Sequence, residues 1–369
     1  MDQSSDFFPG DLETVDADLA SRMDEQSTRL AARMAAINAR YLATKRDVDI
    51  EAELKLLIGN ASVAMAGYQI ERRCLAIIGE TGAGKSRSIG RAIAGRPEFL
   101  PRVTGMTETA PIVFIKAPRP SNLQVIAYEL LEKLQYPLER ELKPAAAWRM
   151  VRRQLKVRKV RFIHIDEAQH MLNMRDHDAM QELSDALKMV MEDDWPVNLI
   201  LTGMPELGDF LSIYRQVARR SHKIHLKNLV SSRDGKLISW IVKTIVEQHA
   251  EMTFAFEYDD VFLARLCHAA NRQLGALTQI VRGAVERALI DNADAKEVTH
   301  GHFVRSYEVF SGCQPEENIL SARGWESIEP MNALLREQEA AHVRLMQALA
   351  ERGRDLRGRR RRRKAEVGA

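Results

Sequence analysis

The sequence has few cysteines and no long apolar run, and each shortage excludes a class of protein. Its three cysteines, Cys74, Cys267 and Cys313, lie far apart and form no CxxC pair. This spacing argues against a disulfide framework or a zinc site and favours buried thiols in a reducing compartment. No run approaches the roughly 20 apolar residues of a membrane helix, and the acidic N-terminus lacks a secretory pattern. We therefore expect a cytoplasmic protein with no membrane partner.

The composition is otherwise that of a globular protein, but its charge is unevenly distributed. Of 369 residues, 45% are hydrophobic and 28% charged, enough for one large or two modest domains. Residues 352–364 carry nine basic side chains and one acidic one, a charge of +8, while the whole chain carries only +3. A basic block of this kind often contacts polyanions, nucleic acid above all. A tail that only aids solubility is the alternative.

Two helical patterns come first. Apolar residues share one helix face at Leu19, Met23, Leu30, Met34, Ile37 and Tyr41, and a second face at Ile50, Leu54, Leu57, Ala61 and Met65. We expect both helices to pack against the domain that follows them. A face for a binding partner is the alternative.

Four short apolar runs separated by helical patterns follow from residue 74. The runs are CLAIIG (74–79), PIVFIKAP (111–118), VRFIHIDE (160–167) and VNLILTG (197–203), and helical patterns lie at 122–134 and 145–156. Short buried strands that alternate with helices indicate βαβ units and a parallel sheet covered on both faces. The predicted fold class is α/β.

Strand patterns end at about residue 230, and helical patterns take their place. They cover residues 236–249, 259–270, 274–292 and 299–310, and Thr299 suits the N-cap of the last. A further helix is expected over 331–349. The sequence thus predicts a small all-helical domain after the α/β domain.

The segment GETGAGKS at 79–86 fits the phosphate-binding pattern G-x-x-x-x-G-K-[ST], and it lies between a predicted strand and a predicted helix. Its glycines allow successive N–H groups to converge on a phosphate, and the helix N-terminus adds a positive dipole end. Lys85 should reach the β- and γ-phosphates of ATP, and Ser86 should bind Mg²⁺. The predicted nucleotide-binding residues are Gly79, Glu80, Thr81, Gly82, Ala83, Gly84, Lys85, Ser86 and Arg87.

Acidic and polar residues end two of the other strands. Asp166 and Glu167 end the third run, so a parallel sheet would bring them to the edge where ligands bind. Asp166 is predicted to hold Mg²⁺, and Glu167 to orient and polarise the attacking water. Thr202 ends the fourth run, where it could contact the γ-phosphate and hold that water; an ordinary strand-end threonine is the alternative. The sequence therefore predicts an ATPase.

The order of P-loop, acidic strand, polar strand end, arginine and helical lid resembles the AAA+ ATPases. In such enzymes an arginine from a neighbouring subunit often completes the site. The segment QVARRSHKIHL offers Arg219 and Arg220, and Arg220 occupies the arginine position of the Q-x-x-x-R pattern. The resemblance implies Arg220 as the catalytic arginine and leaves Arg219 as the alternative.

The same resemblance divides the chain into four parts. They are an N-terminal helical segment (1–70), a nucleotide-binding domain (71–229), a lid (230–312) and a C-terminal helix with basic tail (313–369).

Within this class, FIHIDEAQHML, LILTGMPEL and QVARRSHKIHL resemble the transposition-helper ATPases of the TniB and TnsC type. The resemblance covers residues 30–310. It implies a homo-oligomeric ring or filament that binds double-stranded DNA and recruits or activates a transposase, with a possible target-selection adaptor, while ATP hydrolysis controls disassembly.

The same resemblance places loops after the second and third strands near DNA, which points to Lys116, Arg119 and Arg175. A competing basic cluster precedes the acidic strand, at Arg149, Arg152, Arg153, Lys156, Arg158, Lys159 and Arg161. For this cluster a solvated helix face is the interpretation that we favour over DNA contact. In either case the pattern suggests contacts to phosphates rather than to bases.

Two other functions are consistent with the same nucleotide site. One is a replication initiator or loader, or a secretion-type AAA+ ATPase. The other is a nucleotide-gated switch that binds proteins.

Overall fold

The computed structural model describes residues 17–330 apart from 65–72, 105–106, 120, 137, 139 and 173–175. The chain divides into two compact units, residues 42–228 and residues 1–41 with 229–369. No helix in the described ranges is long and apolar enough to cross a membrane. The helix expected over 331–349, the basic segment 352–364 and Arg175 lie outside the described residues.

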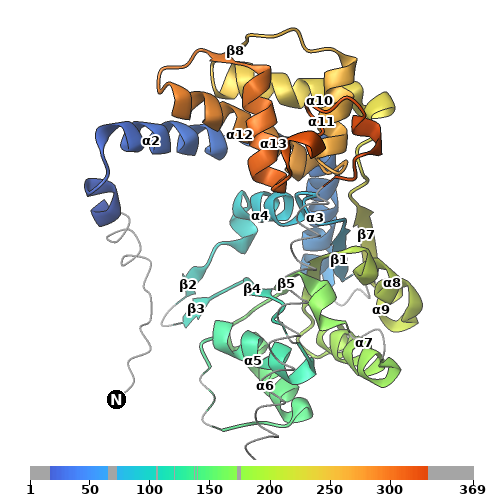
Figure 1. Cartoon of the computed structure of the whole chain (residues 1–369). Coiled ribbons are helices and arrows are strands. Elements are labelled where there is room, and N and C mark those ends of the chain that lie inside the picture. Colours follow the sequence, from blue (N-terminus) through green and yellow to red (C-terminus); the bar gives the residue numbers. More distant parts are fainter. Residues whose placement is uncertain are drawn as a thin grey trace, which may run out of the picture. The chain divides into compact units, whose positions relative to one another are not determined.

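The first unit is built on a five-stranded parallel sheet, which confirms the predicted α/β class (Figure 1). Its strands lie in the order β4 (Ile112–Lys116), β5 (Phe162–Asp166), β6 (Asn198–Gly203), β1 (Cys74–Ile78) and β7 (Ser221–His225). The four apolar runs form β1, β4, β5 and β6. Their register brings the C-terminal ends of β1, β5 and β6 to the same end of the sheet, because Ile77 pairs with Thr202 and Ile165 with Leu201.

The strand β7 was not predicted, because its sequence SHKIH has no apolar run. It is the last strand of the sheet and pairs with β1, and its residues are half-buried or exposed. Edge strands need less apolar surface than central ones. A short antiparallel pair, β2 (Arg102–Thr104) and β3 (Thr107–Thr109), was also not predicted.

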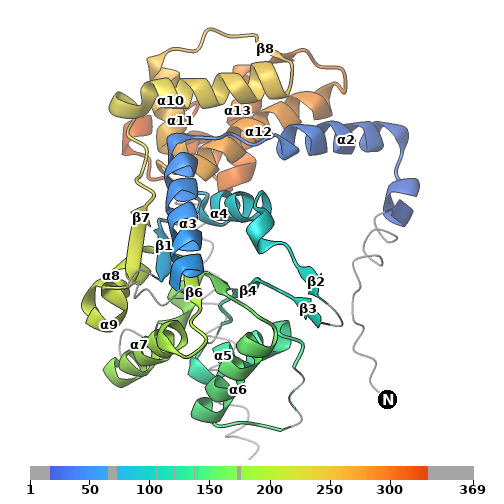
Figure 2. The ribbon, with the colours of Figure 1, turned by 180° about the vertical axis from the view of Figure 1, so that it is seen from behind.

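Helices cover both faces of the sheet. One side carries α3 (Lys45–Ala64) and α4 (Lys85–Ala94), and the other carries α5 (Leu123–Lys133), α6 (Pro144–Val157), α7 (His177–Glu192) and α8 (Pro205–Ile213), followed by α9 (Arg215–Ala218). Figures 1 and 2 show the sheet between these two layers. Asn122 caps α5, whose helical pattern was predicted over residues 122–134.

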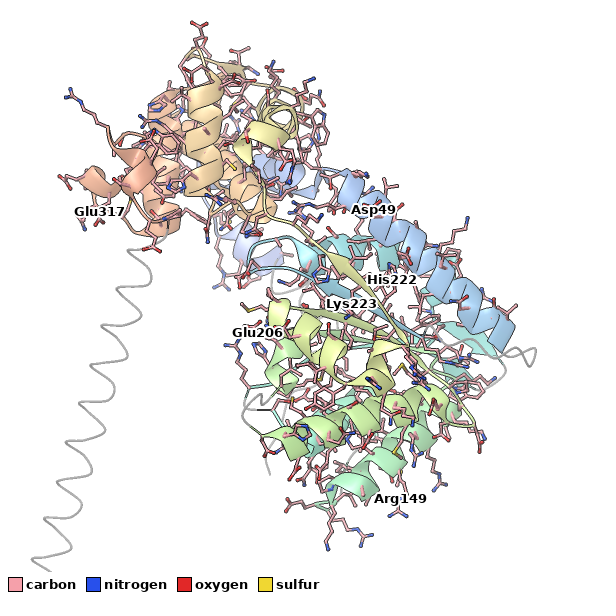
Figure 3. The ribbon with its side chains drawn as sticks, turned by 90° about the vertical axis from the view of Figure 1, so that its right-hand side faces the viewer. Asp49, Arg149, Glu206, His222, Lys223 and Glu317 are labelled. Carbon is pink, nitrogen blue, oxygen red and sulfur yellow. The ribbon has the colours of Figure 1, made fainter. Side chains whose placement is uncertain are left out.

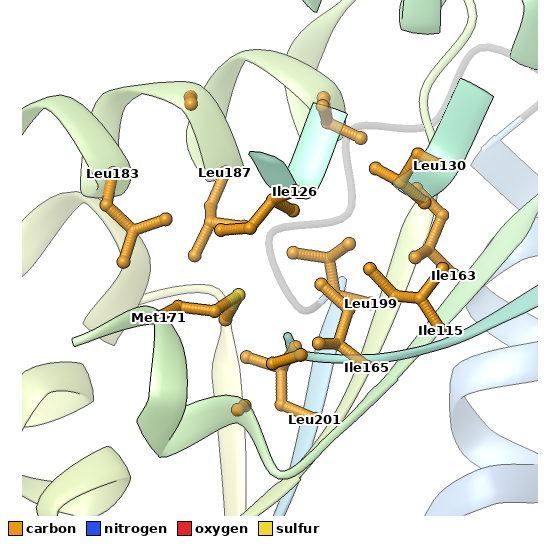
Figure 4. Close-up of a cluster of buried hydrophobic side chains, with 14 of the residues drawn as sticks. Ile115, Ile126, Leu130, Ile163, Ile165, Met171, Leu183, Leu187, Leu199 and Leu201 are labelled. Carbon is orange, nitrogen blue, oxygen red and sulfur yellow. The ribbon is translucent and has the colours of Figure 1, made fainter. Parts of the chain in front are cut away.

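Alternate strand residues enter two separate cores, as the pleat requires. Ile163, Ile165, Leu199 and Leu201 pack with α5 and α7 in the larger core (Figure 4). Ile77 and Ile200 face the other way, toward α3 and α4. The predicted buried face of α3 is confirmed, because Ile50, Leu54, Leu57 and Ala61 all lie in this second core.

The second unit is mainly helical, as predicted. Its helices are α2 (Glu25–Ala39), α10 (Ser231–Lys243) with a π-helical extension (Thr244–His249), α11 (Asp260–Ala269), α12 (Leu274–Asp291) and α13 (His300–Ser311). Thr299 caps α13 through a capping box with His302, which confirms the predicted N-cap. The sequence missed one detail, a pair of two-residue parallel strands, β8 (Thr253–Phe254) and β9 (Glu297–Val298).

The first predicted helix is interrupted and packs differently from our expectation. A helical stretch over 17–21 ends before Asp24, which caps α2 by accepting a hydrogen bond from the Ser27 amide. The helix α2 then lies beside α12 of its own unit, whereas we expected it to pack against the nucleotide domain. Arg33 fixes it there by donating to the carbonyl of Ala293.

Candidate functional site

The glycine-rich loop runs from the end of β1 to the start of α4. Gly82 and Gly84 have φ angles of 80° and 90°, a left-handed conformation that glycine adopts at little cost. A side chain at Gly79 would bring its Cβ within 3.1 Å of Leu226 Cβ and 3.2 Å of Ala83 Cβ. The motif glycines therefore serve both the bend of the loop and its close packing.

Lys85 opens α4, and its side chain turns back over the loop. Only 6% of the residue is exposed, and Nζ donates to the carbonyl oxygens of Gly79 at 2.8 Å and Glu80 at 2.9 Å. Burial lowers the pKa of Lys85, and the carboxylates of Glu167, Asp166 and Glu80 oppose this effect. The arrangement holds a cation inside the curve of the loop, beside the N-terminus of α4, where an anion binds well.

The remaining motif residues surround this centre. Ala83 is buried, whereas Glu80, Thr81, Ser86 and Arg87 are exposed. Ser86 lies in the first turn of α4, and its side chain forms a hydrogen bond with Asp166. The structure thus joins the end of the glycine-rich loop to the end of β5.

Asp166 is surrounded by hydrogen-bond donors. Burial would raise the pKa of its carboxyl group, but hydrogen bonds from Thr202, Ser86 and the Glu167 amide, together with nearby His164, bring the pKa below its usual value. The carboxylate is therefore kept ionised. Its oxygens and the Ser86 hydroxyl are the hard donors that Mg²⁺ prefers, so the side chains that meet here fit the metal expected with ATP.

Thr202 is fully buried at the end of β6. Its hydroxyl donates to Asp166 Oδ1 and lies 3.3 Å from His164 Nε2. Because the one hydroxyl proton points to Asp166, His164 must donate through Nε2. Burial lowers the pKa of His164 to about 4, so the ring is neutral near pH 7. The hydroxyl of Thr202 thus supports Asp166 in this structure.

Glu167 follows directly in the left-handed region, with φ of 54°. Gln169, in the short 3₁₀ helix Ala168–Met171, donates from Nε2 to Glu167 Oε2 at 2.5 Å. The other end of the same amide accepts a hydrogen bond from the Met204 amide at 3.1 Å. Sequence analysis did not select Gln169, although it lies within the IDEAQH segment, because an amide without a fixed partner gives no signal of its own.

Two of the residues predicted to contact DNA lie near the end of β4. Lys116 is exposed at the end of that strand, and Arg119 is exposed in the loop after it. Arg119 Nε donates to His170 Nε2, and His170 Nδ1 lies 3.3 Å from the Ala117 carbonyl oxygen. The loop after β4 is therefore tied to the segment that carries Glu167.

The two candidate arginines differ in their surroundings. Arg220 is paired with Glu192 and also donates to the Gln216 carbonyl. Arg219 is exposed, and its side chain has no hydrogen bond or ion pair with any residue in the described ranges. Both precede β7, which runs parallel to β1. They therefore lie where the strands begin, whereas the glycine-rich loop of the same chain lies where the strands end.

The competing basic cluster is also divided by its contacts. Arg149, Arg153 and Lys156 are exposed on α6, and Figure 3 shows Arg149 at the surface of this unit. Arg152 instead pairs with Asp193 at 3.1 Å, and the Arg161 guanidinium lies over the Trp195 ring. Part of the cluster therefore supports the fold.

Comparison with known proteins is informative about the fold. Residues 69–211 match the model of the AAA domain. Among solved structures, Cdc6p from Pyrobaculum aerophilum has a TM-score of 0.51 and 15% identity, and the match covers 77% of this chain and 75% of that one. The Aeropyrum pernix ORC2 protein, solved as ADPNP–ADP complexes, has a TM-score of 0.50 and 16% identity, with 76% and 73% covered. The search of curated proteins finds no match. The chain has the P-loop AAA+ fold.

Proposed function

On the premise of this AAA domain, we propose that the protein binds ATP with Mg²⁺, hydrolyses it, and assembles on double-stranded DNA as a homo-oligomer. The observation that carries the proposal is the meeting of Lys85, Ser86, Asp166 and Glu167 at one edge of the sheet. The similar ORC2 protein was solved with nucleotides, and we extend nucleotide binding to this chain.

Each residue has a distinct role in the proposed reaction. The loop amides and Lys85 bind the phosphates, and Ser86 and Asp166 hold Mg²⁺, which when bound neutralises charge on the phosphate oxygens. Glu167 orients water and accepts its proton as the water attacks the γ-phosphorus. Thr202 keeps Asp166 ionised and in place through its hydrogen bond. The protein thus contributes mainly alignment and electrostatic stabilisation.

An oligomer is proposed because the site of one chain offers too little positive charge. Arg219 and Arg220 lie at the end of the sheet where the strands begin, away from the glycine-rich loop of their own chain. They can therefore serve only the nucleotide site of a neighbouring subunit. Sequence analysis favoured Arg220. The exposure of Arg219 and the Arg220–Glu192 ion pair make Arg219 the better placed of the two.

DNA is the proposed scaffold, and recruitment or activation of a transposase is the proposed output. Lys116 and Arg119, both exposed near one strand end, support phosphate contacts. The transposase and any target-selection adaptor rest on the sequence resemblance to the TniB and TnsC type. A replication initiator or loader is the second candidate, and the fold similarity to Cdc6p and ORC2 favours it.

Electron microscopy of the protein with duplex DNA and a non-hydrolysable ATP analogue tests the assembly. We expect rings or filaments on DNA, and the variant Glu167→Gln should form them with ATP itself because it binds ATP but does not hydrolyse it. The matched control is Glu182→Gln, an exposed residue of α7, which should disassemble as ATP is consumed. Monomers that stay off DNA would contradict the proposal.

Adding a transposase or a helicase to the DNA-bound oligomer then distinguishes the two candidate functions, transposase recruitment and helicase loading. Stimulated strand transfer by a transposase is the expected result. Loading of a helicase with no effect on strand transfer would favour the initiator.

A further inference from the structure

The side-chain amide of Gln169 joins the carboxylate of Glu167 to the main chain at the end of β6. Its Nε2 donates to Glu167 Oε2 at 2.5 Å, and its Oε1 accepts from the Met204 amide at 3.1 Å. Both ends of the amide are therefore used, and the Met204 amide fixes which end is oxygen. One oxygen of Glu167 is bound by Gln169, and the other accepts no hydrogen bond from any residue that the structure describes.

The backbone and the side chain of Glu167 both explain why a second residue is required to hold its carboxylate. Its φ of 54° places it in a region that residues other than glycine rarely adopt. Its flexible side chain loses conformational entropy when it is held in one rotamer. A carboxylate that must meet a water molecule in a defined direction therefore gains from a second residue that holds it.

The packing around the Gln169 amide restricts the conformations of this side chain. A Cβ on Gly203 would lie 2.9 Å from Gln169 Oε1 and 2.9 Å from Leu207 Cδ2. The absence of a side chain at position 203 is what leaves room for the amide. On its other side, His170 Nδ1 lies 3.3 Å from the carbonyl oxygen of Ala117. The short helix that carries Gln169 is thus tied to the ends of β4 and β6, on both sides of Glu167.

We propose that Gln169 is a positioning residue for Glu167, which it holds in the orientation that activates water. The inference rests on the proposed function, because Glu167 has this task only if the chain hydrolyses ATP. Gln169 itself does not touch the reacting atoms; it acts through the carboxylate of its neighbour.

Two substitutions separate the two hydrogen bonds of the amide. Gln169→Glu keeps an acceptor for the Met204 amide but cannot donate to Glu167, whereas Gln169→Ala removes both bonds. We expect kcat for ATP to fall about 10- to 100-fold in each variant, with the affinity for ATP changed less than about twofold. Gln181→Glu is the matched control, since Gln181 is half-buried on α7 and its side chain donates to Asp185; its kcat should be that of the wild type.

Hydrogen exchange of the ligand-free protein supplies a readout that does not depend on activity. The Met204 amide should stay protected in Gln169→Glu and should exchange at least about tenfold faster in Gln169→Ala. A loss of kcat in Gln169→Glu with Met204 still protected would assign the effect to the bond with Glu167. A wild-type kcat in Gln169→Glu would overturn the proposal.

A double-mutant cycle with Glu167→Gln tests whether Gln169 acts through Glu167. In the Glu167→Gln background, Gln169→Glu should change the residual rate less than about twofold. An equal loss in both backgrounds would show that Gln169 acts elsewhere and would overturn the proposal. A wild-type protein that hydrolyses no ATP contradicts the proposed function instead, and this is seen before any variant is measured.

Discussion

The hydroxyl of Thr202 donates a hydrogen bond to Asp166 Oδ1, and so links the ends of two neighbouring strands beneath the glycine-rich loop. On its other side the same oxygen lies 3.3 Å from His164 Nε2. The chain His164–Thr202–Asp166 therefore sets the orientation and the ionisation of the carboxylate proposed to hold Mg²⁺. This contact leads to the first two predictions.

Thr202→Val removes the hydroxyl at nearly constant shape and should weaken the hold on Mg²⁺. We expect the Mg²⁺ concentration for half-maximal hydrolysis to rise about tenfold, as is typical when a residue behind a metal ligand is lost. The free energy of unfolding should fall by about 1–2 kcal/mol, because Asp166 loses a donor. Thr278→Val is the control, since the Thr278 hydroxyl donates to the Leu274 carbonyl within its own helix, α12. An unchanged Mg²⁺ requirement in Thr202→Val would contradict this role.

His164 should make the protein less stable in mild acid. Burial lowers its pKa from 6.5 to about 4, so between these values the unfolded chain binds a proton that the folded chain does not. Stability is therefore lost as the pH falls below about 6.5, and the loss, about 3 kcal/mol at most, is complete below pH 4. Urea unfolding at pH 6.5 and pH 5 measures about half of this loss, above the range where Asp166 titrates.

The variant His164→Gln cannot titrate, and its stability should fall less over this interval. His177→Gln, at an exposed position of α7, should keep the wild-type slope. The same slope in His164→Gln as in the wild type would show that other groups cause the acid sensitivity.

Arg219 and Arg220 should differ when each is changed to alanine. We expect Arg219→Ala to lower hydrolysis by the oligomer about 10³-fold, as loss of a trans arginine does, while ATP still binds. Arg220→Ala should mainly break the ion pair with Glu192, at a cost of about 1 kcal/mol or less. Glu192→Gln is its control and should have the same small effect.

Mixing subunits tests the same assignment. Arg219→Ala subunits keep an intact site, and Glu167→Gln subunits keep an intact Arg219, so a mixture should regain hydrolysis that neither has alone. If Arg220→Ala behaves in this way and Arg219→Ala does not, Arg220 is the catalytic arginine.

Lys116 and Arg119 should account for part of the salt dependence of DNA binding. Each phosphate contact contributes about 0.9 to the slope of log K against log salt, so the double variant Lys116→Ala/Arg119→Ala should reduce the slope by about 2. The pair Arg149→Ala/Arg153→Ala on α6 is the matched control. A reduced slope in the α6 pair alone would place DNA on that helix instead.

The sequence predicted those parts of the fold that local patterns determine. Four strands were found because their apolar runs are continuous, and α5, α11 and α13 begin beside capping residues, Asn122, Asp259 and Thr299. The edge strand β7 was missed because half of its surface needs no apolar residue. The break before Asp24 and the packing of α2 were missed because a helical period does not identify a neighbour.

For the candidate site, the sequence predicted the motif residues but not the contacts between their side chains and others. The P-loop and Asp166–Glu167 have a fixed spacing, and the sheet register brings them together. The contacts of Gln169 with Glu167 and of Arg220 with Glu192 depend on which side chains meet after folding. The Q-x-x-x-R pattern favours Arg220, but it does not show that Arg220 forms an ion pair with Glu192 while Arg219 forms none with any described residue.

The most direct test of the account is calorimetric titration of ATP with Mg²⁺ into the wild-type protein and into Lys85→Ala. Lys133→Ala, at an exposed position of α5, is the control for the loss of a positive charge. We predict micromolar binding to the wild type and to Lys133→Ala, and no measurable binding to Lys85→Ala. Equal affinity of all three proteins, or no heat of binding from any of them, would contradict the claim that this loop binds the nucleotide.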